Sequence, residues 1–391
     1  MLDIQQVRQE TPVCLQKIHL NNAGASLQPQ VVMQSVLDYL QLEAETGGYE
    51  TATLKAQEIQ GFYTAVAQLL KTKPQNIAYA HHATEAYNKA LSSIPFERGD
   101  ILLTTDDDYA SNQIAFLQLQ QKLGIQIIRA AQLPEGGVDV NSVEELIKKH
   151  CPKLVAVTHI PSNSGLIQDV YSIGRLCQQH DILYLVDACQ SVGQLDLDVN
   201  EMHCDFLSAT GRKYLRGPRG TGFLYVSDKA LALHLEPLFL DLGSADWSAP
   251  FGYQVAPTAR RFEYWENNRA NLVGLKTAVE YALQIGLPAI EKRALQLGDY
   301  TRRQITQYTD FQVLDRGNHL CSIVTIHHSK YDGAALKKRL VTNNINVSLA
   351  VRMSALLDFE RKGVEWALRI SPHCFNKKEE IDELIQLFNT L

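Results

Sequence analysis

Lys213 and Asp187 are residue types that can support chemistry on an organic cofactor, and their spacing suits that chemistry. Lys213 lies 26 positions after Asp187 and directly precedes the glycine-rich block "YLRGPRGTG". The apolar run "ILYLVD" ends at Asp187, and "TGFLYVS" has the composition of another strand. Taken alone, Lys213 would be a solvated loop charge and Asp187 a helix cap or an ion-pair partner. Together they predict a pyridoxal phosphate site, in which the lysine forms a Schiff base and the carboxylate keeps the pyridine nitrogen protonated.

Further polar residues are expected at the same edge of the sheet, because ligands of open parallel sheets bind at the carboxyl ends of the strands. Each of the following comes at or after a short apolar run: Tyr109, His159, Asn163, Gln190, Thr210 and Arg212. The segment "HHATEAYNKAL" reads as a helix start, whose free backbone N–H groups could bind a phosphate. The lysine, the carboxylate and the phosphate cup of a pyridoxal phosphate site are therefore all present.

Alternating strand and helix patterns predict the sheet that positions these residues. The runs "KLVAVTHI" (153–160) and "ILYLVDA" (182–188) flank "YSIGRLCQQH", which has helical spacing, and the three predict a βαβ unit with parallel strands. The runs "DILLTTDD", "IQIIRAA" and "TGFLYVS" are expected to add strands to this sheet. The character of the sequence changes after about residue 250, where a long helical stretch (272–305) is expected, interrupted near Gly286 and Pro288. "CSIVTIHH" then begins a second set of strands and helices.

Composition and charge exclude several classes of protein. The chain has 391 residues and a formal net charge of −6, which argues against a nucleic acid or an anionic membrane as partner. No apolar run reaches the roughly 18 residues that span a bilayer, and the start lacks the apolar core of a signal peptide, so we expect a cytoplasmic location. The seven cysteines are scattered and never form a C-x-x-C pair, which indicates reduced thiols. No metal site is expected, because the histidines lack further ligands at suitable spacing.

Two motifs resemble those of a known family. "VDACQSVGQ" resembles the strand end V-D-x-A-Q, and "TGRKYLRGPRGTGFLYV" resembles the block G-H-K-x-x-G-P-x-G-x-G-x-L-Y of class V aminotransferases. These are fold type I pyridoxal phosphate enzymes, a family that includes cysteine desulfurases, cystine C–S lyases and isopenicillin N epimerase-like proteins. The resemblance extends from "HLNNAGAS" to "LRISPHCFNKKEEIDEL". It implies an α/β fold with three parts: an N-terminal arm (1–20) that joins the small domain, a large domain (21–245) with a mostly parallel sheet of the seven-stranded type, and a smaller α+β domain (246–391) that begins with a long interdomain helix.

The resemblance also implies roles for individual residues. Lys213 would form the Schiff base, Asp187 would pair with the pyridine nitrogen, and Tyr109 would stack on the ring. Asn163 and Gln190 would lie beside the phenolic oxygen. The other implied cofactor contacts are Ala83, Thr84, Thr210, Arg212 and Asn268. The implied substrate contacts are Asn22, Ala23 and Arg369, and the Arg369 guanidinium suits the substrate carboxylate.

Three departures from the family pattern bear on function. Arg212 replaces the histidine that precedes the lysine, which adds a positive charge near the phosphate. Glu266 lies near the position of a threonine that reaches the partner subunit's phosphate, and a carboxylate there would be repelled, so Asn267 or Asn268 is expected to make that contact. The stretch 344–371 has no cysteine, although desulfurases of the family carry a nucleophilic one there. This absence disfavours a persulfide-forming desulfurase.

We therefore expect a homodimeric pyridoxal phosphate-dependent enzyme that acts on a small amino-acid substrate, with its active sites at the dimer interface. A C–S lyase or an aminotransferase-like enzyme is favoured. An amino acid epimerase or a persulfide-forming desulfurase is the alternative, because the cofactor supplies the electron sink in each reaction. A phosphate- or nucleotide-binding regulatory α/β protein is a non-enzymatic alternative, which is disfavoured because the lysine precedes its glycines and no G-x-x-x-x-G-K-[ST] occurs.

Overall fold

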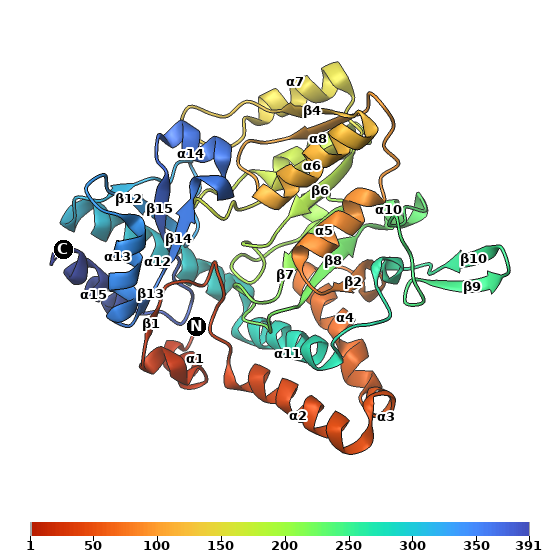
Figure 1. Ribbon diagram of the computed structural model, residues 1–391, viewed down its shortest axis with the longest axis horizontal. Coiled ribbons are helices and arrows are strands. Elements are labelled where there is room, and N and C mark those ends of the chain that lie inside the picture. Colours follow the sequence, from red (N-terminus) through yellow and green to blue (C-terminus); the bar gives the residue numbers. More distant parts are fainter. Residues whose placement is uncertain (1, 391) are drawn as a thin grey trace.

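A seven-stranded sheet lies at the centre of the larger part of the chain in this computed structural model, which describes residues 2–390 (Figure 1). Its strands are β2 (Ile77–Ala80), β3 (Ile101–Thr104), β4 (Gln126–Arg129), β5 (Leu154–Thr158), β6 (Leu183–Asp187), β7 (Phe206–Thr210) and β8 (Gly222–Val226). Their order is β2-β8-β7-β6-β5-β3-β4. The pairs from β7 to β4 are parallel, whereas β8 runs antiparallel to both of its neighbours. The mostly parallel α/β sheet expected from the sequence is confirmed.

Helices cover both faces of this sheet. They are α4 (Ala56–Leu70), α5 (Ala83–Ser92), α6 (Ala110–Leu123), α7 (Val140–His150), α8 (Val170–Gln179) and α11 (Arg269–Ile285). The α5 and α6 helices pack on one face, and the other four pack on the opposite face. In α8, Ile173 and Cys177 lie one turn apart on the buried side, and Asp169 caps the first turn by accepting from Ser172 N. Within residues 2–390, none of the helices is both long enough and apolar enough to cross a membrane.

A second sheet, with four strands, lies at the centre of the C-terminal part. Its strands are β11 (Gln312–Val313), β12 (Val324–His327), β14 (Ser348–Val351) and β15 (Trp366–Ile370). They pair antiparallel in the order β11-β12-β15-β14. The helices that pack on them are α12 (Leu287–Tyr308), α13 (Gly333–Thr342) and α15 (Lys378–Phe388). The N-terminal strand β1 (Ile18–His19) pairs in parallel with β13 (Ile345–Asn346), so the start of the chain joins this part of the molecule (Figure 1).

The segment after residue 245 begins with a β-hairpin that the sequence did not predict, and the expected helical stretch follows it as α11 and α12. Strands β9 (Ala245–Ala249) and β10 (Gly252–Val255) project from the body of the molecule (Figure 1). Ala259 and Phe262 then enter the core beneath α5, and α11 packs against α4 and α2 (Gln30–Thr46). Gly286, with a φ of 93°, separates α11 from α12. We therefore propose that the small domain begins near Gly286, with residues 1–20 as an arm that joins it.

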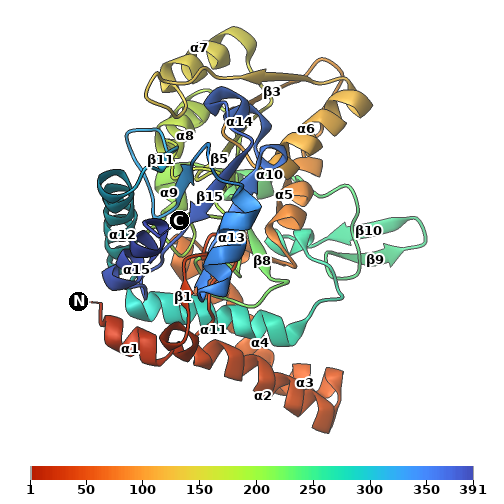
Figure 2. The same cartoon turned by 60° about the vertical axis from the view of Figure 1, so that its left-hand side comes forward.

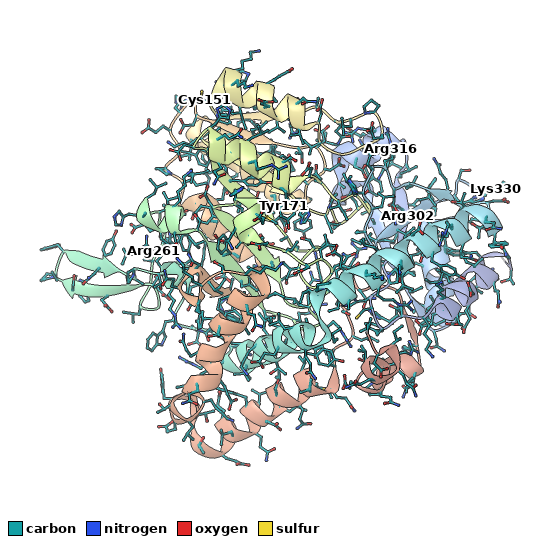
Figure 3. The ribbon with its side chains drawn as sticks, turned by 180° about the vertical axis from the view of Figure 1, so that it is seen from behind. Cys151, Tyr171, Arg261, Arg302, Arg316 and Lys330 are labelled. Atoms are coloured by element: carbon teal, nitrogen blue, oxygen red, sulfur yellow. The ribbon has the colours of Figure 1, made fainter. Side chains whose placement is uncertain are left out.

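Polar contacts join the large domain to the small domain near the end of β5. Arg302, which projects from α12 (Figure 3), donates to Asp315 Oδ2 at 2.9 Å, and Asp315 Oδ1 accepts from Gly165 N at 3.0 Å. A Cβ atom at position 165 would clash with Arg302 Nη2 and with Ile323 O, so glycine is required for this close approach. The loop after β5, which carries Asn163, is therefore held against the small domain.

Candidate active site

A cavity opens at the carboxyl ends of β5, β6 and β7, where the sequence places most of the candidate residues. Eight of the predicted residues line it: Ala83, Thr84, Tyr109, Asp187, Gln190, Thr210, Arg212 and Lys213. The rest of its lining consists of His82, Thr158, Ile160, Ser162 and Cys189. Five predicted residues lie outside this lining: Asn22, Ala23, Asn163, Asn268 and Arg369. The geometry of each group shows what it can bind.

Lys213 follows β7 and is 8% exposed. Burial lowers the pKa of its amine, and the nearby Asp187 carboxylate partly opposes this effect. The glycines explain how the lysine is placed, because Gly217 N donates to Gly211 O at 2.8 Å and closes a turn around it. A Cβ atom on Gly211 would clash with Thr221 Oγ1, so the turn needs glycine there. The result is a buried amine whose lowered pKa makes it a readier proton acceptor than an exposed lysine.

Asp187, the last residue of β6, is held by two donors. Its Oδ1 accepts from Cys189 N at 2.9 Å, and its Oδ2 accepts from Asn112 Nδ2 at 3.0 Å. Asn112 lies in the first turn of α6 and also donates to Asp108 Oδ1 at 3.0 Å. Asp108 accepts from Thr158 Oγ1, and burial raises the pKa of Asp108. The sequence analysis missed Asn112, although its position four residues after Asp108, just beyond a strand end, is a signal that could have identified it.

The N-terminus of α5 supplies backbone N–H groups to the cavity. Ala83 and Thr84 are its first residues, and the N–H groups of a first turn have no acceptor within the helix. Gly222 of β8 lets the sheet approach this turn closely, because a Cβ atom there would lie 2.6 Å from Ala209 O and 3.1 Å from Ala83 N. Such a helix start is suited to bind a phosphate.

Thr210 and Arg212 line the cavity beside this helix start. Thr210 Oγ1 donates to Thr221 O at 3.1 Å, and Arg212 Nη1 donates to Gly24 O in the N-terminal loop. Burial lowers the pKa of Arg212, but a guanidinium stays charged near neutral pH. Arg212 therefore adds positive charge for an anion and joins the N-terminal loop to the cavity.

These features fit pyridoxal phosphate. The N-terminus of α5, Thr210 and Arg212 would hold the phosphate. Asp187 would pair with the pyridine nitrogen, and Lys213 would bond to the aldehyde carbon. Gln190 Oε1 is buried with no partner among the described residues, as expected of a group whose partner is a ligand. Tyr109, which is 37% exposed, lines the same cavity and would stack on the ring.

Asn163 and Arg369 lie just outside the lining. Asn163 Nδ2 donates to Asp358 Oδ2 at 2.6 Å, and its buried Oδ1 has no partner within residues 2–390. Arg369 Nη1 donates at 2.8 Å to the backbone oxygen of Ser162, which lines the cavity, and its Nε is buried and also without a described partner. Both side chains therefore retain groups that can bind a ligand.

Asn22 and Ala23 connect the small domain to the cavity. Asn22 Nδ2 donates to Ser371 O at 2.8 Å, and Asn22 Oδ1 accepts from Ser26 Oγ at 2.6 Å. Ala23 N donates to Ser371 Oγ at 3.0 Å, and Ala23 O accepts from Gln190 Nε2 at 3.1 Å. The Asn22 side chain thus holds the loop in place, and its two polar atoms already have partners in the chain.

Asn268 lies at a separate, open cavity of about 500 Å³. Its side chain caps α11 by accepting from Asn271 N at 2.8 Å. Glu266 and Asn267 line the same cavity, together with Tyr49 from the segment that follows α2. Asn268 therefore lies at a different cavity from the one that Lys213 and Asp187 line, on the surface that the family resemblance predicts to face a partner subunit.

The cysteines near the site do not have the environment of a nucleophile. Cys189 lines the cavity, and burial raises the pKa of its thiol well above the usual value. Cys374 is 1% exposed, and burial raises its pKa as well. The stretch 344–371 contains β13, β14, a short 3-10 helix (Arg352–Ser354), α14 (Leu356–Lys362) and β15. A reactive cysteine needs a lowered pKa and some exposure, and neither of these thiols has a lowered pKa.

Comparisons with known proteins agree with this site. The model of the family described as aminotransferase class-V matches residues 18–384. A probable cysteine desulfurase from Methanothermobacter thermautotrophicus is 27% identical over 390 residues, which cover 97% of this chain and 96% of that protein. A probable hercynylcysteine sulfoxide lyase from Mycobacterium tuberculosis is 26% identical over 377 residues, which cover 93% of this chain and 88% of that protein. The apo structure of a cysteine desulfurase from Thermococcus onnurineus matches with a TM-score of 0.91 and 25% identity, over 100% of this chain and 99% of that one.

The family match spans both domains and includes the block around Lys213. It confirms the fold, the cofactor and the class of enzyme that the sequence motifs led us to expect. The chain belongs to the aminotransferase class-V family and is a pyridoxal phosphate-dependent enzyme.

Proposed function

We propose that this enzyme is a C–S lyase, which cleaves the Cβ–S bond of a sulfur-containing amino acid by β-elimination. The stretch 344–371 carries the proposal, because it holds no cysteine and packs on the large domain through Asp358 and Arg361. Burial raises the pKa of both Cys189 and Cys374, so neither offers a ready thiolate. The similarity to a probable hercynylcysteine sulfoxide lyase supports the same class of reaction. Without a thiolate to accept it, the sulfur leaves with the rest of the substrate.

Arg369 would bind the substrate, and Lys213 would transfer the proton. The buried Arg369 Nε, which has no described partner, would donate to the substrate carboxylate. Lys213, whose pKa is lowered by burial, would take the proton from Cα and return it to the leaving sulfur. Asp187, held by Asn112, would keep the pyridine nitrogen protonated. Bound pyridoxal phosphate supplies the sink for the electrons released at Cα.

The net reaction needs no oxidant or reductant. The Cα–H and Cβ–S bonds break, the electron pair of the Cα–H bond forms the Cα=Cβ bond, and the sulfur leaves with the electrons of the Cβ–S bond. Water then converts the released aminoacrylate to pyruvate. The balance is R–S–CH2–CH(NH3+)–COO− plus H2O giving R–SH, pyruvate and NH4+.

The test measures the products that the enzyme forms from a panel of amino acids. Cystine, cysteine S-oxides and ordinary transamination donors are each given to the cofactor-loaded enzyme, and pyruvate, ammonia and the cofactor spectrum are measured. We expect equal amounts of pyruvate and ammonia from a sulfur-containing substrate, and no turnover by Lys213→Ala. Borohydride reduction and peptide mapping should place the pyridoxyl group on Lys213. A keto acid that appears only with conversion of the cofactor to its amine form would instead indicate transamination.

A cysteine desulfurase is the second candidate. The similarity to two cysteine desulfurases and the presence of Cys189 in the cavity favour it. This candidate predicts alanine and an enzyme-bound persulfide from cysteine, and Cys189→Ala should then lose the persulfide. Pyruvate release that is unaffected in Cys189→Ala would exclude it.

We also propose that the enzyme is a homodimer located in the cytoplasm. Exposed apolar side chains surround the Asn268 cavity, among them Trp265 at 50% and Tyr49 at 73% exposure, and their burial against a second copy would stabilise a dimer. All seven cysteine thiols are free in the structure, which suits a reducing compartment. Sedimentation at assay concentration should show a dimer, and a fully active monomer would contradict this.

A further inference from the structure

The helix α14 belongs to the C-terminal part of the chain but lies against the large domain (Figure 2). Arg361 Nη2 donates to Asp106 Oδ2 at 2.6 Å, in an ion pair whose side chains are 31% and 26% exposed. Asp358 is buried, and its Oδ2 accepts from Lys362 Nζ at 2.7 Å and from Asn163 Nδ2 at 2.6 Å. The helix thus contacts the large domain through a surface ion pair and through a buried hydrogen bond.

Asn163 lies between α14 and the cofactor cavity. Its neighbour Ser162 lines that cavity, whereas Ser164 lines a small pocket together with Asp358. Asn163 is 2% exposed, and its Oδ1 has no partner among the described residues. A buried amide oxygen destabilises the fold unless water or a ligand satisfies it. The Asn163 amide therefore binds α14 through one N–H of Nδ2, and the second N–H of Nδ2, like Oδ1, has no partner among the described residues.

We infer that Asp358 is a positioning residue, which fixes the orientation of the Asn163 amide beside the phenolic oxygen of the cofactor. The inference rests on the proposed role of Asn163 as a neighbour of that oxygen. A carboxylate oxygen can only accept a hydrogen bond, so Asp358 admits the nitrogen end of the amide and excludes the oxygen end. The second N–H of Nδ2 then remains to donate to the phenolic oxygen.

The surroundings of Asp358 hold this arrangement in place. Lys362 balances its charge one turn along α14, and the two side chains are 7% and 6% exposed. Asp107 lies close by, and burial together with the Asp358 charge raises the pKa of Asp107 to about 6. Gln132 donates to the Asp107 carboxylate. Removing the Asp358 carboxylate would leave Lys362 without this partner and would allow the Asn163 amide to rotate.

The experiment compares the cofactor-loaded enzyme with Asn163→Ala, Asp358→Ala, the double variant and Arg361→Ala. The readouts are the midpoint pH of the visible absorption change of the bound cofactor, and KM and kcat measured separately. Loss of a hydrogen bond to a charged oxygen corresponds to a shift of about one pH unit or more. We expect both single variants to shift the midpoint in the same direction by comparable amounts, and the double variant to shift it no further than the larger of them. Arg361→Ala, which removes only the surface ion pair of α14, should keep the wild-type midpoint.

An unchanged midpoint in Asp358→Ala or additive shifts in the double variant would overturn the inference. An equal shift in Arg361→Ala would also overturn it, because it would indicate general loosening of α14. An unchanged midpoint in Asn163→Ala would overturn it together with the role of Asn163. Cofactor binding and C–S cleavage by the unchanged enzyme are measured separately, so a failure of the proposed function is distinguishable. Asp358→Asn serves if the alanine variant does not fold. It has nearly the same volume but can present either end of its amide, so we expect a shift in the same direction, and no shift would also overturn the inference.

Discussion

Glu263 is a buried carboxyl group whose ionisation should make stability fall as pH rises. Its Oε1 accepts from Tyr79 N at 2.8 Å and its Oε2 accepts from Tyr63 OH at 3.0 Å. Burial raises the pKa of Glu263 to about 7, against the opposing effects of these hydrogen bonds and of Arg260 and Lys89. The folded protein therefore holds this proton more tightly than the unfolded chain does.

The size and sign of the effect follow from linkage. The difference between about 7 and the ordinary value of 4.5, at about 1.36 kcal/mol for each pH unit, corresponds to about 3 kcal/mol. Below about pH 4.5 both states are protonated and this contribution is fully present. Between about pH 4.5 and 7 the unfolded chain has released its proton while the folded protein retains it, so the contribution is lost as pH rises. Above about pH 7 the loss is complete.

The assay compares wild type with Glu263→Gln, in which the site cannot ionise. Gln can accept from Tyr79 N with its oxygen and donate to the Tyr63 hydroxyl with its nitrogen. The free energy of unfolding is measured in urea for both proteins from pH 4 to pH 8, and groups that titrate in both cancel in the difference. We expect wild type to lose about 3 kcal/mol relative to Glu263→Gln over this range. A difference that stays constant with pH would refute the reasoning.

Three further substitutions test the cofactor and substrate contacts. Arg369→Lys should raise KM by about tenfold or more with a smaller change in kcat, because a lysine cannot form the two-pronged contact with a carboxylate; equal losses in both would contradict this. Gly222→Ala should lower Tm and weaken cofactor binding in equilibrium dialysis, because its Cβ would lie 2.6 Å from Ala209 O. Asn112→Ala should lower kcat/KM by about tenfold to a hundredfold, since it removes a donor 3.0 Å from Asp187 Oδ2; a normal rate would count against the proposed role of Asp187.

The patterns of the sequence predicted the large sheet well but not the hairpin after it. Strands β5 and β6 are continuous apolar runs joined by a helix of clear periodicity, so their parallel pairing could be read directly. The antiparallel direction of β8 could not be predicted, because a short apolar run does not indicate whether the strand pairs in parallel or antiparallel. The hairpin of β9 and β10 was missed because its large residues, Trp247, Phe251 and Tyr253, are all exposed. Hydrophobic periodicity reports a buried face, and this hairpin has none within a single chain.

The candidate site shows the same limit at the level of side chains. Lys213 and Asp187 were predicted together because they lie at or just after the ends of neighbouring strands, β7 and β6, and are only 26 positions apart in the sequence. The partner of Asn163 was not predicted, because Asp358 lies 195 positions away and on another domain. The contacts of Asn22 escaped for the same reason, since Ser371 is 349 positions from it. Hydrogen bonds between distant segments leave no periodic signal in a single sequence.

The pairing of β1 with β13 determines when during biosynthesis the site can be completed. Ile18 pairs with Ile345, and Leu20 O accepts from Ser371 N, so the arm that leads to Asn22 has its partners about 330 residues later in the chain. At a synthesis rate of about 5 to 20 residues per second, the arm waits for about 15 to 65 s before those partners exist. The large sheet, by contrast, is complete once β8 has been made. The nascent protein can therefore assemble its phosphate cup while the substrate side of the site is still missing, and a chain that ends before residue 345 would lack both Arg369 and the strand that pairs with the arm.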